Sequence, residues 1–154
     1  MTDIATVILA AGAGTRMKSK KPKVLHQIAG RAMVSHLLDT VSALEPDLNI
    51  VVVAPGMDDV REEVAPAVTA VQEEALGTGH AVAAALPNLE GFGGDVLVLY
   101  GDTPLITQET LQRMIEMRRA DEGTAVVVLG FEPDDPLEYG RLITNVAGDL
   151  EAIV

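Results

Sequence analysis

Short apolar runs alternate along the chain with longer stretches in which apolar residues recur at helical spacing. Continuous runs of Val, Ile and Leu, without a polar residue at every second position, are typical of strands covered on both faces of a parallel sheet. We therefore expect strands over residues 5–9, 49–54, 69–71, 95–100 and 125–129.

Helical spacing is clearest where Met33, Leu37 and Val41 fall on one side of a predicted helix. Thr107 is placed to cap the last predicted helix, with Glu109 near its positive end. We expect helices over residues 30–45, 58–65, 80–86 and 107–123, and a hairpin that pairs residues 141–144 with 150–154. This alternation predicts a three-layer α/β/α fold around a mostly parallel sheet with right-handed crossovers.

Three polar or glycine-rich loops follow predicted strands, and open α/β sheets bind their ligands beyond the carboxyl ends of the strands. The first loop begins with Ala10, Ala11 and Gly12, whose nearly bare backbone can approach an anion. Basic residues then crowd residues 16–23, although the net charge of the chain is −12. Five of the eleven basic residues lie there: Arg16, Lys18, Lys20, Lys21 and Lys23.

The first loop matches neither the P-loop pattern nor the dinucleotide fingerprint, because Met17 stands where the latter needs glycine. The pattern favours a phosphate site, while the alternative is a tight turn with solvated lysines. In the third loop, Asp102 is the best candidate for a Mg²⁺ ligand, or else a turn aspartate before Thr103 and Pro104. In the second loop, the Gln72 amide either contacts a base edge or caps the next helix.

Composition excludes several kinds of chemistry. The chain has no cysteine, which removes disulfides, thiolate zinc sites and cysteine nucleophiles. His26, His36 and His80 share no metal-ligand spacing, and we interpret them as structural or solvent-facing. The negative net charge disfavours nucleic-acid binding, and no apolar run approaches the ~18 residues of a membrane span. We expect a cytoplasmic protein that binds a small phosphorylated ligand and reacts without a covalent intermediate, as in phosphoryl or nucleotidyl transfer.

Five segments jointly resemble the sugar-1-phosphate nucleotidyltransferases, and among them the bacterial bifunctional uridylyltransferase/acetyltransferase enzymes. They are Leu9–Met17, Pro22–His26 with Ala29 and Gly30, Leu76–Ala81, Leu99–Leu105 and Glu138–Arg141. The resemblance implies a Rossmann-like, GT-A-like nucleotidyltransferase fold and transfer of UMP from UTP to N-acetylglucosamine 1-phosphate. The products would be UDP-N-acetylglucosamine, a cell-wall precursor, and pyrophosphate.

The same resemblance implies a role for each matching residue. Arg16 and Lys23 would neutralise the triphosphate, and Asp102 would bind the catalytic Mg²⁺. The other implied contacts are backbone contacts of the nucleoside with Leu9, Ala10, Ala11 and Gly12, contacts of the uracil with Gln72, Gly77 and Thr78, and a border to the ribose and sugar formed by Tyr100, Gly101 and Gly140.

The resemblance also implies residues that the 154-residue chain does not contain. Family members carry a Glu and two Asn further along the domain, and then a β-helix acetyltransferase domain through which they form homotrimers. We therefore expect residues 1–154 to be the N-terminal portion of a uridylyltransferase domain that binds UTP weakly and turns over poorly or not at all. Two alternatives stay open: a nucleotidyltransferase for another sugar phosphate, molybdopterin or a methylerythritol phosphate, and a non-catalytic nucleotide-binding module.

Overall fold

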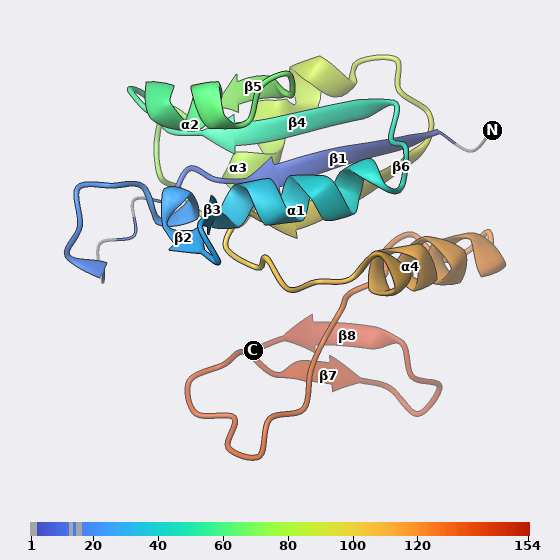
Figure 1. Cartoon of the computed structure of the whole chain (residues 1–154). Coiled ribbons are helices and arrows are strands. Elements are labelled where there is room, and N and C mark those ends of the chain that lie inside the picture. The colour runs from blue at the N-terminus through green and yellow to red at the C-terminus, as the bar shows by residue number, and fades with distance from the viewer. Residues whose placement is uncertain (1–2, 13, 15–16) are drawn as a thin grey trace. The chain divides into compact units, whose positions relative to one another are not determined.

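The computed structural model describes residues 3–12, 14 and 17–154. These residues form two compact units, residues 1–113 and residues 114–154, with the boundary inside the last helix. Each unit is described by itself below, and Figure 1 gives the course of the chain. Within the described residues, every helix is too short or too polar to cross a lipid bilayer.

The first unit is built on a four-stranded sheet in which every neighbouring pair is parallel. Its strands are β1 (Ile4–Leu9), β4 (Leu48–Val53), β5 (Val68–Val71) and β6 (Asp95–Tyr100), in the order β5-β4-β1-β6. The strand nearest the N-terminus therefore lies inside the sheet, with later strands on both sides of it. The predicted parallel sheet is confirmed.

Helices follow the strands of this sheet and begin or end a few residues from their predicted bounds. They are α1 (Met33–Ser42), α2 (Asp58–Glu63), α3 (Thr78–Ala85) and α4 (Gln108–Ala120), with the 3-10 helices η2 (Lys23–Leu25) and η3 (Leu86–Leu89). Helix α1 begins three residues later than predicted because a small hairpin precedes it. That hairpin pairs β2 (Gln27–Ile28) with β3 (Arg31–Ala32), and its turn places Ala29 and Gly30 at positive φ.

Helix α4 begins as the sequence predicts, directly after Thr107. The Thr107 hydroxyl accepts a hydrogen bond from the backbone N–H of Thr110 at 3.3 Å, which satisfies one of the free donors of the first turn. The pKa of Glu109 lies below its ordinary value because its carboxylate accepts hydrogen bonds from its own backbone N–H and from the Thr107 hydroxyl. The predicted cap is confirmed.

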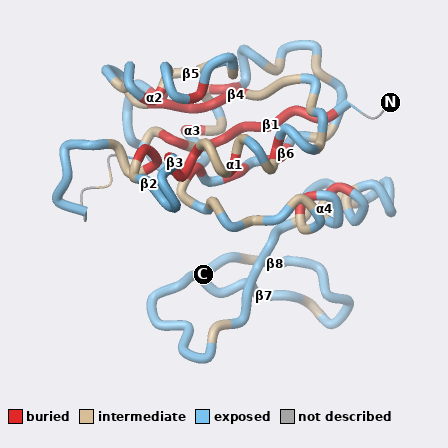
Figure 2. The backbone as a smooth tube through the Cα atoms, viewed as in Figure 1, coloured by how far each residue is buried: buried red, intermediate tan, exposed pale blue. Residues whose placement is uncertain are grey.

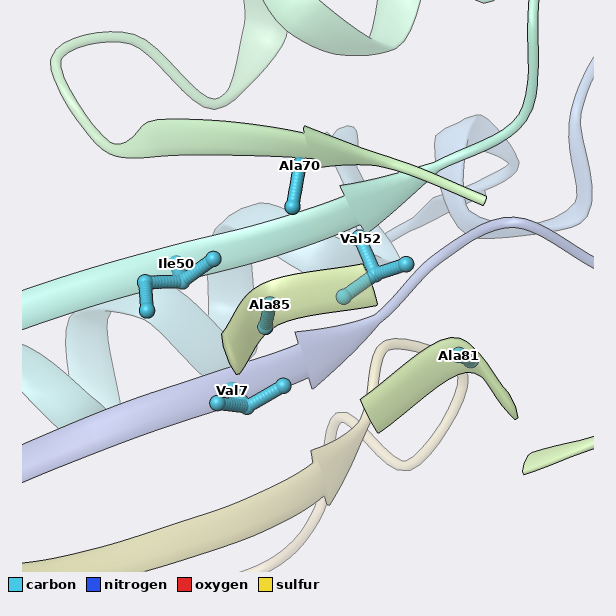
Figure 3. Packing of buried hydrophobic residues seen from close by; sticks show 6 residues of the cluster. All are labelled: Val7, Ile50, Val52, Ala70, Ala81 and Ala85. Carbon is cyan, nitrogen blue, oxygen red and sulfur yellow. The ribbon is translucent and has the colours of Figure 1, made fainter. Parts of the chain in front are cut away.

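Helix α3 covers one face of the sheet through two alanines (Figure 3). Because Ala81 and Ala85 are small, the backbone of this short helix packs close to the strands. The buried cluster consists of Val7, Ile50, Val52, Ala70, Ala81 and Ala85. Figure 2 shows this burial concentrated along β1 and β4.

Helix α1 lies on the other side of the sheet from α3 (Figure 1). Met33, Leu37 and Val41 are buried, as their spacing predicts, and Val34 is fully buried as well. The first unit therefore has the three layers that the sequence predicts.

Two sequence-based expectations about strands are wrong. Residues 125–129 form no strand, and their apolar side chains Val126 and Leu129 are exposed. Strand β6 was expected to be buried on both faces, yet Val96 and Val98 are about two-fifths exposed. Among the described strands β6 pairs only with β1, and an edge strand with one uncovered face alternates in burial even when its sequence is continuously apolar.

The second unit contains the predicted hairpin, in which β7 (Leu142–Thr144) pairs antiparallel with β8 (Leu150–Ile153). Asn145 closes the turn, because its side-chain oxygen accepts hydrogen bonds from the backbone N–H groups of Ala147 and Asp149, both at 2.9 Å. Gly148 takes a positive φ of 92° in the same turn. The predicted hairpin is confirmed.

Gly94 is a point of close backbone approach between the starts of β1 and β6. A Cβ atom there would lie 2.1 Å from the backbone oxygen of Asp3, which accepts the N–H of Asp95 at 3.0 Å. We expect Gly94→Ala to lower the free energy of unfolding by at least about 2 kcal/mol, measured by urea denaturation. Gly93→Ala is the control, since a Cβ there meets nothing within 4 Å; an equal loss in both variants would contradict the steric explanation.

Candidate functional site

The three candidate loops leave the sheet at the same edge. Each first extends the parallel ladder by one residue: the N–H of Ala10 donates to Val52, that of Gln72 to Val53, and that of Gly101 to Leu9, at 2.8–3.0 Å. Because all four strands are parallel, these loops follow carboxyl ends that face the same way. This is the edge where open α/β sheets present their ligands.

Lys23 and Asp102 meet at this edge although they lie 79 residues apart in the sequence. Lys23 Nζ donates to Asp102 Oδ2 at 2.5 Å, which is a charge-assisted hydrogen bond. Lys23 comes from η2, and Asp102 follows β6. The Lys23 side chain is 42% exposed and that of Asp102 is 31% exposed, so both charges are accessible to a ligand.

Two glycines allow the loops to pack closely around this pair. A Cβ on Gly101 would lie 3.0 Å from Val24 Cγ1 and 3.1 Å from the Leu9 oxygen. A Cβ on Gly14, which has a φ of +59°, would lie 2.9 Å from Lys23 Cβ. The small residues of the first loop thus bring its backbone against the segment that carries Lys23, as a phosphate-binding loop requires.

The donor set fits a divalent cation that shares its coordination with a ligand. Asp102 supplies a hard carboxylate oxygen, and no group of three His, Cys, Asp or Glu side chains in the described part of the chain could hold a metal by itself. Mg²⁺ is commonly bound by one or two carboxylates together with waters and substrate phosphates. Asp102 therefore suits a metal that arrives with a phosphorylated ligand.

Gln72 directly follows β5 and is buried, with an exposed fraction of 7%. Its side-chain nitrogen donates to the carbonyl oxygen of Gly77 at 3.1 Å and lies 3.2 Å from His80 Nδ1. Gly77 immediately precedes α3 and has a φ of 98°, a conformation that favours glycine. Gln72 thus contacts both the loop that follows its strand, at Gly77, and the helix after that loop, at His80.

The remaining predicted site residues are distributed as follows. Ala10 is buried, Leu9 and Ala11 are half-buried, and Gly12 is exposed. Thr78 is the exposed first residue of α3, and Tyr100 is 49% exposed at the end of β6. Arg16 lies outside the described residues. Gly140 lies in the second unit, beside Ile153 of β8, and is described apart from the others.

Two cavities of about 630 and 570 Å³ lie along α1 and α2, and none of the predicted site residues lines them. They share Arg31, Ser35 and Glu63, and the larger one also has Asp59 and Glu62 in its wall. The carboxylates in the wall of the larger cavity disfavour the binding of a phosphate there. The candidate site is an open edge of the sheet, so an enclosed cavity is a poor guide to it. Lys18, Lys20 and Lys21 of the basic run are exposed.

His80 makes a contact that the sequence does not predict. It is exposed, in agreement with its interpretation as structural or solvent-facing, and its ring nitrogen lies within hydrogen-bond distance of Gln72. The two residues are eight positions apart across a loop and a helix start, a separation with no periodic pattern. Their shared position after one strand was the only available signal.

The structure is an α/β fold with a basic residue and a carboxylate paired beyond parallel strands, and the family comparison assigns it to the nucleotidyltransferase class. The chain belongs to the MobA-like NTP transferase domain family, whose model matches residues 6–152.

Curated relatives agree with this family. The chain is 63% identical over 154 residues to the bifunctional protein GlmU of Rhodospirillum rubrum and 60% identical over 151 residues to that of Paramagnetospirillum magneticum. These matches cover 100% and 98% of this chain but only 34% and 33% of the relatives, so the chain spans about a third of their length. The predicted resemblance to the bifunctional enzymes is confirmed.

Solved structures support the same fold. HddC from Yersinia pseudotuberculosis, in a structure described as complexed with GMP-PN, matches with a TM-score of 0.77 and 25% identity over 100% of this chain and 69% of that chain. Rv0371c from Mycobacterium tuberculosis matches with a TM-score of 0.67 and 25% identity over 79% of this chain and 63% of that chain. The predicted α/β Rossmann-like nucleotidyltransferase fold is confirmed.

Proposed function

We propose that this chain provides the nucleotide-binding edge of a uridylyltransferase that transfers UMP from UTP to N-acetylglucosamine 1-phosphate. The observation that carries the proposal is the contact between Lys23 and Asp102 at the carboxyl edge of the sheet, beside a loop of small residues. The choice of UTP and of the amino sugar rests on the similarity to GlmU proteins. These substrates are small molecules, and we propose that the reaction occurs in the cytoplasm.

The order of the strands supports a nucleotide lying across the edge. Gln72 follows β5 and Asp102 follows β6, with β4 and β1 between them. Neighbouring strands lie about 4.8 Å apart, so three steps correspond to roughly 14 Å. That span is long for a single ring and suits a base joined through a ribose to phosphates. We assign the uracil to Gln72, Gly77 and Thr78, and the triphosphate to Lys23 and Arg16.

The remaining assignments rest on the similarity to GlmU proteins. The backbone of the first loop lies next to the nucleoside in this proposal, and Asp102 is the ligand of Mg²⁺. The residues of the first loop are Leu9, Ala10, Ala11 and Gly12, and those that border the ribose and sugar are Tyr100, Gly101 and Gly140.

The reaction needs positioning and charge neutralisation more than proton transfer. An oxygen of the sugar phosphate is already anionic, so it attacks the α-phosphorus of UTP without a general base. The new bond joins that oxygen to the α-phosphorus, the bond from the α-phosphorus to the bridging oxygen breaks, and pyrophosphate leaves with the electron pair. Lys23 and Arg16 neutralise the phosphate oxygens, and a bound Mg²⁺ would add further positive charge there.

A nucleotide panel tests the proposal. Isothermal titration calorimetry of the 154-residue chain with Mg²⁺ is expected to show binding of UTP at least about tenfold tighter than binding of CTP, GTP or ATP. Omitting Mg²⁺ is expected to weaken the binding of UTP, because Lys23 then has to neutralise Asp102 as well as the triphosphate. Preferential binding of GTP or CTP, or the absence of nucleotide binding, would overturn the uridylyl assignment.

A further inference from the structure

The side-chain amide of Gln72 has one possible orientation in its surroundings. The Gly77 carbonyl at 3.1 Å can only accept a hydrogen bond, so the NH₂ end of the amide faces it and the oxygen does not. Because Gln72 is 93% buried, with 7% of its surface exposed, water cannot readily substitute for a lost partner. The assignment of nitrogen and oxygen thus follows from the chemistry of the neighbour.

His80 uses the second hydrogen of the same NH₂ group. Its Nδ1 lies 3.2 Å from Gln72 Nε2 and accepts a hydrogen bond from the amide in the tautomer that carries its proton on Nε2. Both amide hydrogens are then directed to protein acceptors. The Gln72 oxygen, on the other side of the amide carbon, is left as the group that can accept a hydrogen bond from a ligand.

We propose that His80 is a positioning residue that fixes the Gln72 amide with its oxygen toward the nucleobase and thereby selects uracil over cytosine. This inference rests on the proposed function, in which Gln72 contacts the base. Uracil carries a hydrogen on N3 that a fixed carbonyl oxygen accepts. Cytosine carries a lone pair at N3, which a rotated amide could satisfy with its NH₂ group but a fixed carbonyl repels.

The support for His80 comes from the helix that carries it. His80 lies in the first turn of α3, and the next residue, Ala81, is buried against the sheet, as is Ala85 one turn further on. The backbone beneath the imidazole is therefore held by core packing, while the ring itself is exposed. With the Gly77 bond alone, the amide keeps one unpaired hydrogen and more rotational freedom about its last torsion. The hydrogen bond to His80 pairs that hydrogen and restricts the rotation of the amide.

Two substitutions at His80 separate a positioning role from a merely structural one. His80→Leu removes the acceptor, and we expect the ratio of UTP to CTP affinity to fall about three- to tenfold, the factor that one hydrogen bond supplies. His80→Asn keeps an oxygen close to the place of Nδ1, and we expect it to retain most of the ratio. His36→Leu is the matched control, because His36 is another helical histidine, half-buried, whose ring nitrogen bonds to the Ile28 carbonyl away from this edge.

A double-mutant cycle shows whether the effect passes through Gln72. In the Gln72→Leu background, His80→Leu is expected to change the UTP to CTP ratio by less than about twofold, because no amide remains to be positioned. Circular dichroism of each variant checks that α3 still forms. If wild-type protein binds UTP selectively and His80→Leu keeps that selectivity, the inference about His80 is wrong while the proposed function stands. If wild-type protein itself shows no preference for UTP, both are wrong.

Discussion

Replacing Asp102 with Asn is expected to weaken Mg²⁺-dependent binding of UTP by at least about a hundredfold. Loss of a residue that only orients a metal ligand costs about 10- to 100-fold in metal affinity, and Asp102 is proposed as a direct ligand. Asn keeps the size of the side chain and one oxygen but removes the charge that attracts the cation. Titration calorimetry with UTP at saturating and at zero Mg²⁺ gives both affinities.

Binding without metal provides an internal control for Asp102→Asn. In the presence of EDTA, the variant is expected to bind UTP at least as tightly as the wild type, because a negative charge near the triphosphate is removed and Lys23 is released. A general loss of structure would weaken binding under both conditions. Asp39→Asn is a matched variant, since Asp39 pairs with Arg31 at 2.6 Å on α1, away from the edge. Unchanged metal dependence in Asp102→Asn would remove Asp102 from the metal site.

The core of the fold was predictable because its signals are local. Residues 50–54 are continuously apolar, and Met33, Leu37 and Val41 repeat at helical spacing, so each element shows which surface it buries. The parallel sheet follows from the alternation of these elements. The hairpin of the second unit also follows from local chemistry, through the turn residues Ala147, Gly148 and Asp149.

Burial at the margins of the sheet was less predictable because it depends on neighbours. Residues 125–129 have the composition of a strand, but a strand needs a partner for its hydrogen bonds, and the sequence does not say which partner is present. β6 shows the same effect, since Val96 and Val98 would be buried only if something covered that face. Propensity predicts a pleated, apolar segment; contacts decide whether it joins a sheet.

The site was predicted as separate residues and not as contacts. The place of Asp102 after a strand predicts its role, the family resemblance singles out Lys23 among the basic residues, and the structure adds that the two meet at 2.5 Å. Gln72 was chosen for its amide, and only the structure supplies its bonds to Gly77 and His80. Spacing along a chain carries little information about contacts that cross several elements.

Replacing Lys23 with Met is expected to change two affinities in opposite directions. Binding of UTP should fall about 10- to 150-fold, because hydrogen bonds to charged groups contribute about 1.5–3 kcal/mol. Binding of Mn²⁺ to the free protein should instead rise about five- to thirtyfold. The ammonium group now lies at Asp102 Oδ2, and in solvent a unit and a divalent charge about 4 Å apart repel each other by about 2 kcal/mol. Electron paramagnetic resonance measures free Mn²⁺ without nucleotide.

Lys21→Met is the matched control, since Lys21 belongs to the same basic run but is exposed. If charge density alone attracted the triphosphate, both variants would lose UTP affinity to a similar extent and neither would gain affinity for Mn²⁺. A rise in Mn²⁺ affinity confined to Lys23→Met would instead mean that Lys23 competes with the cation for Asp102. Since the triphosphate offers Lys23 another anionic partner, nucleotide binding would then free Asp102 for the metal, and each ligand would strengthen the binding of the other.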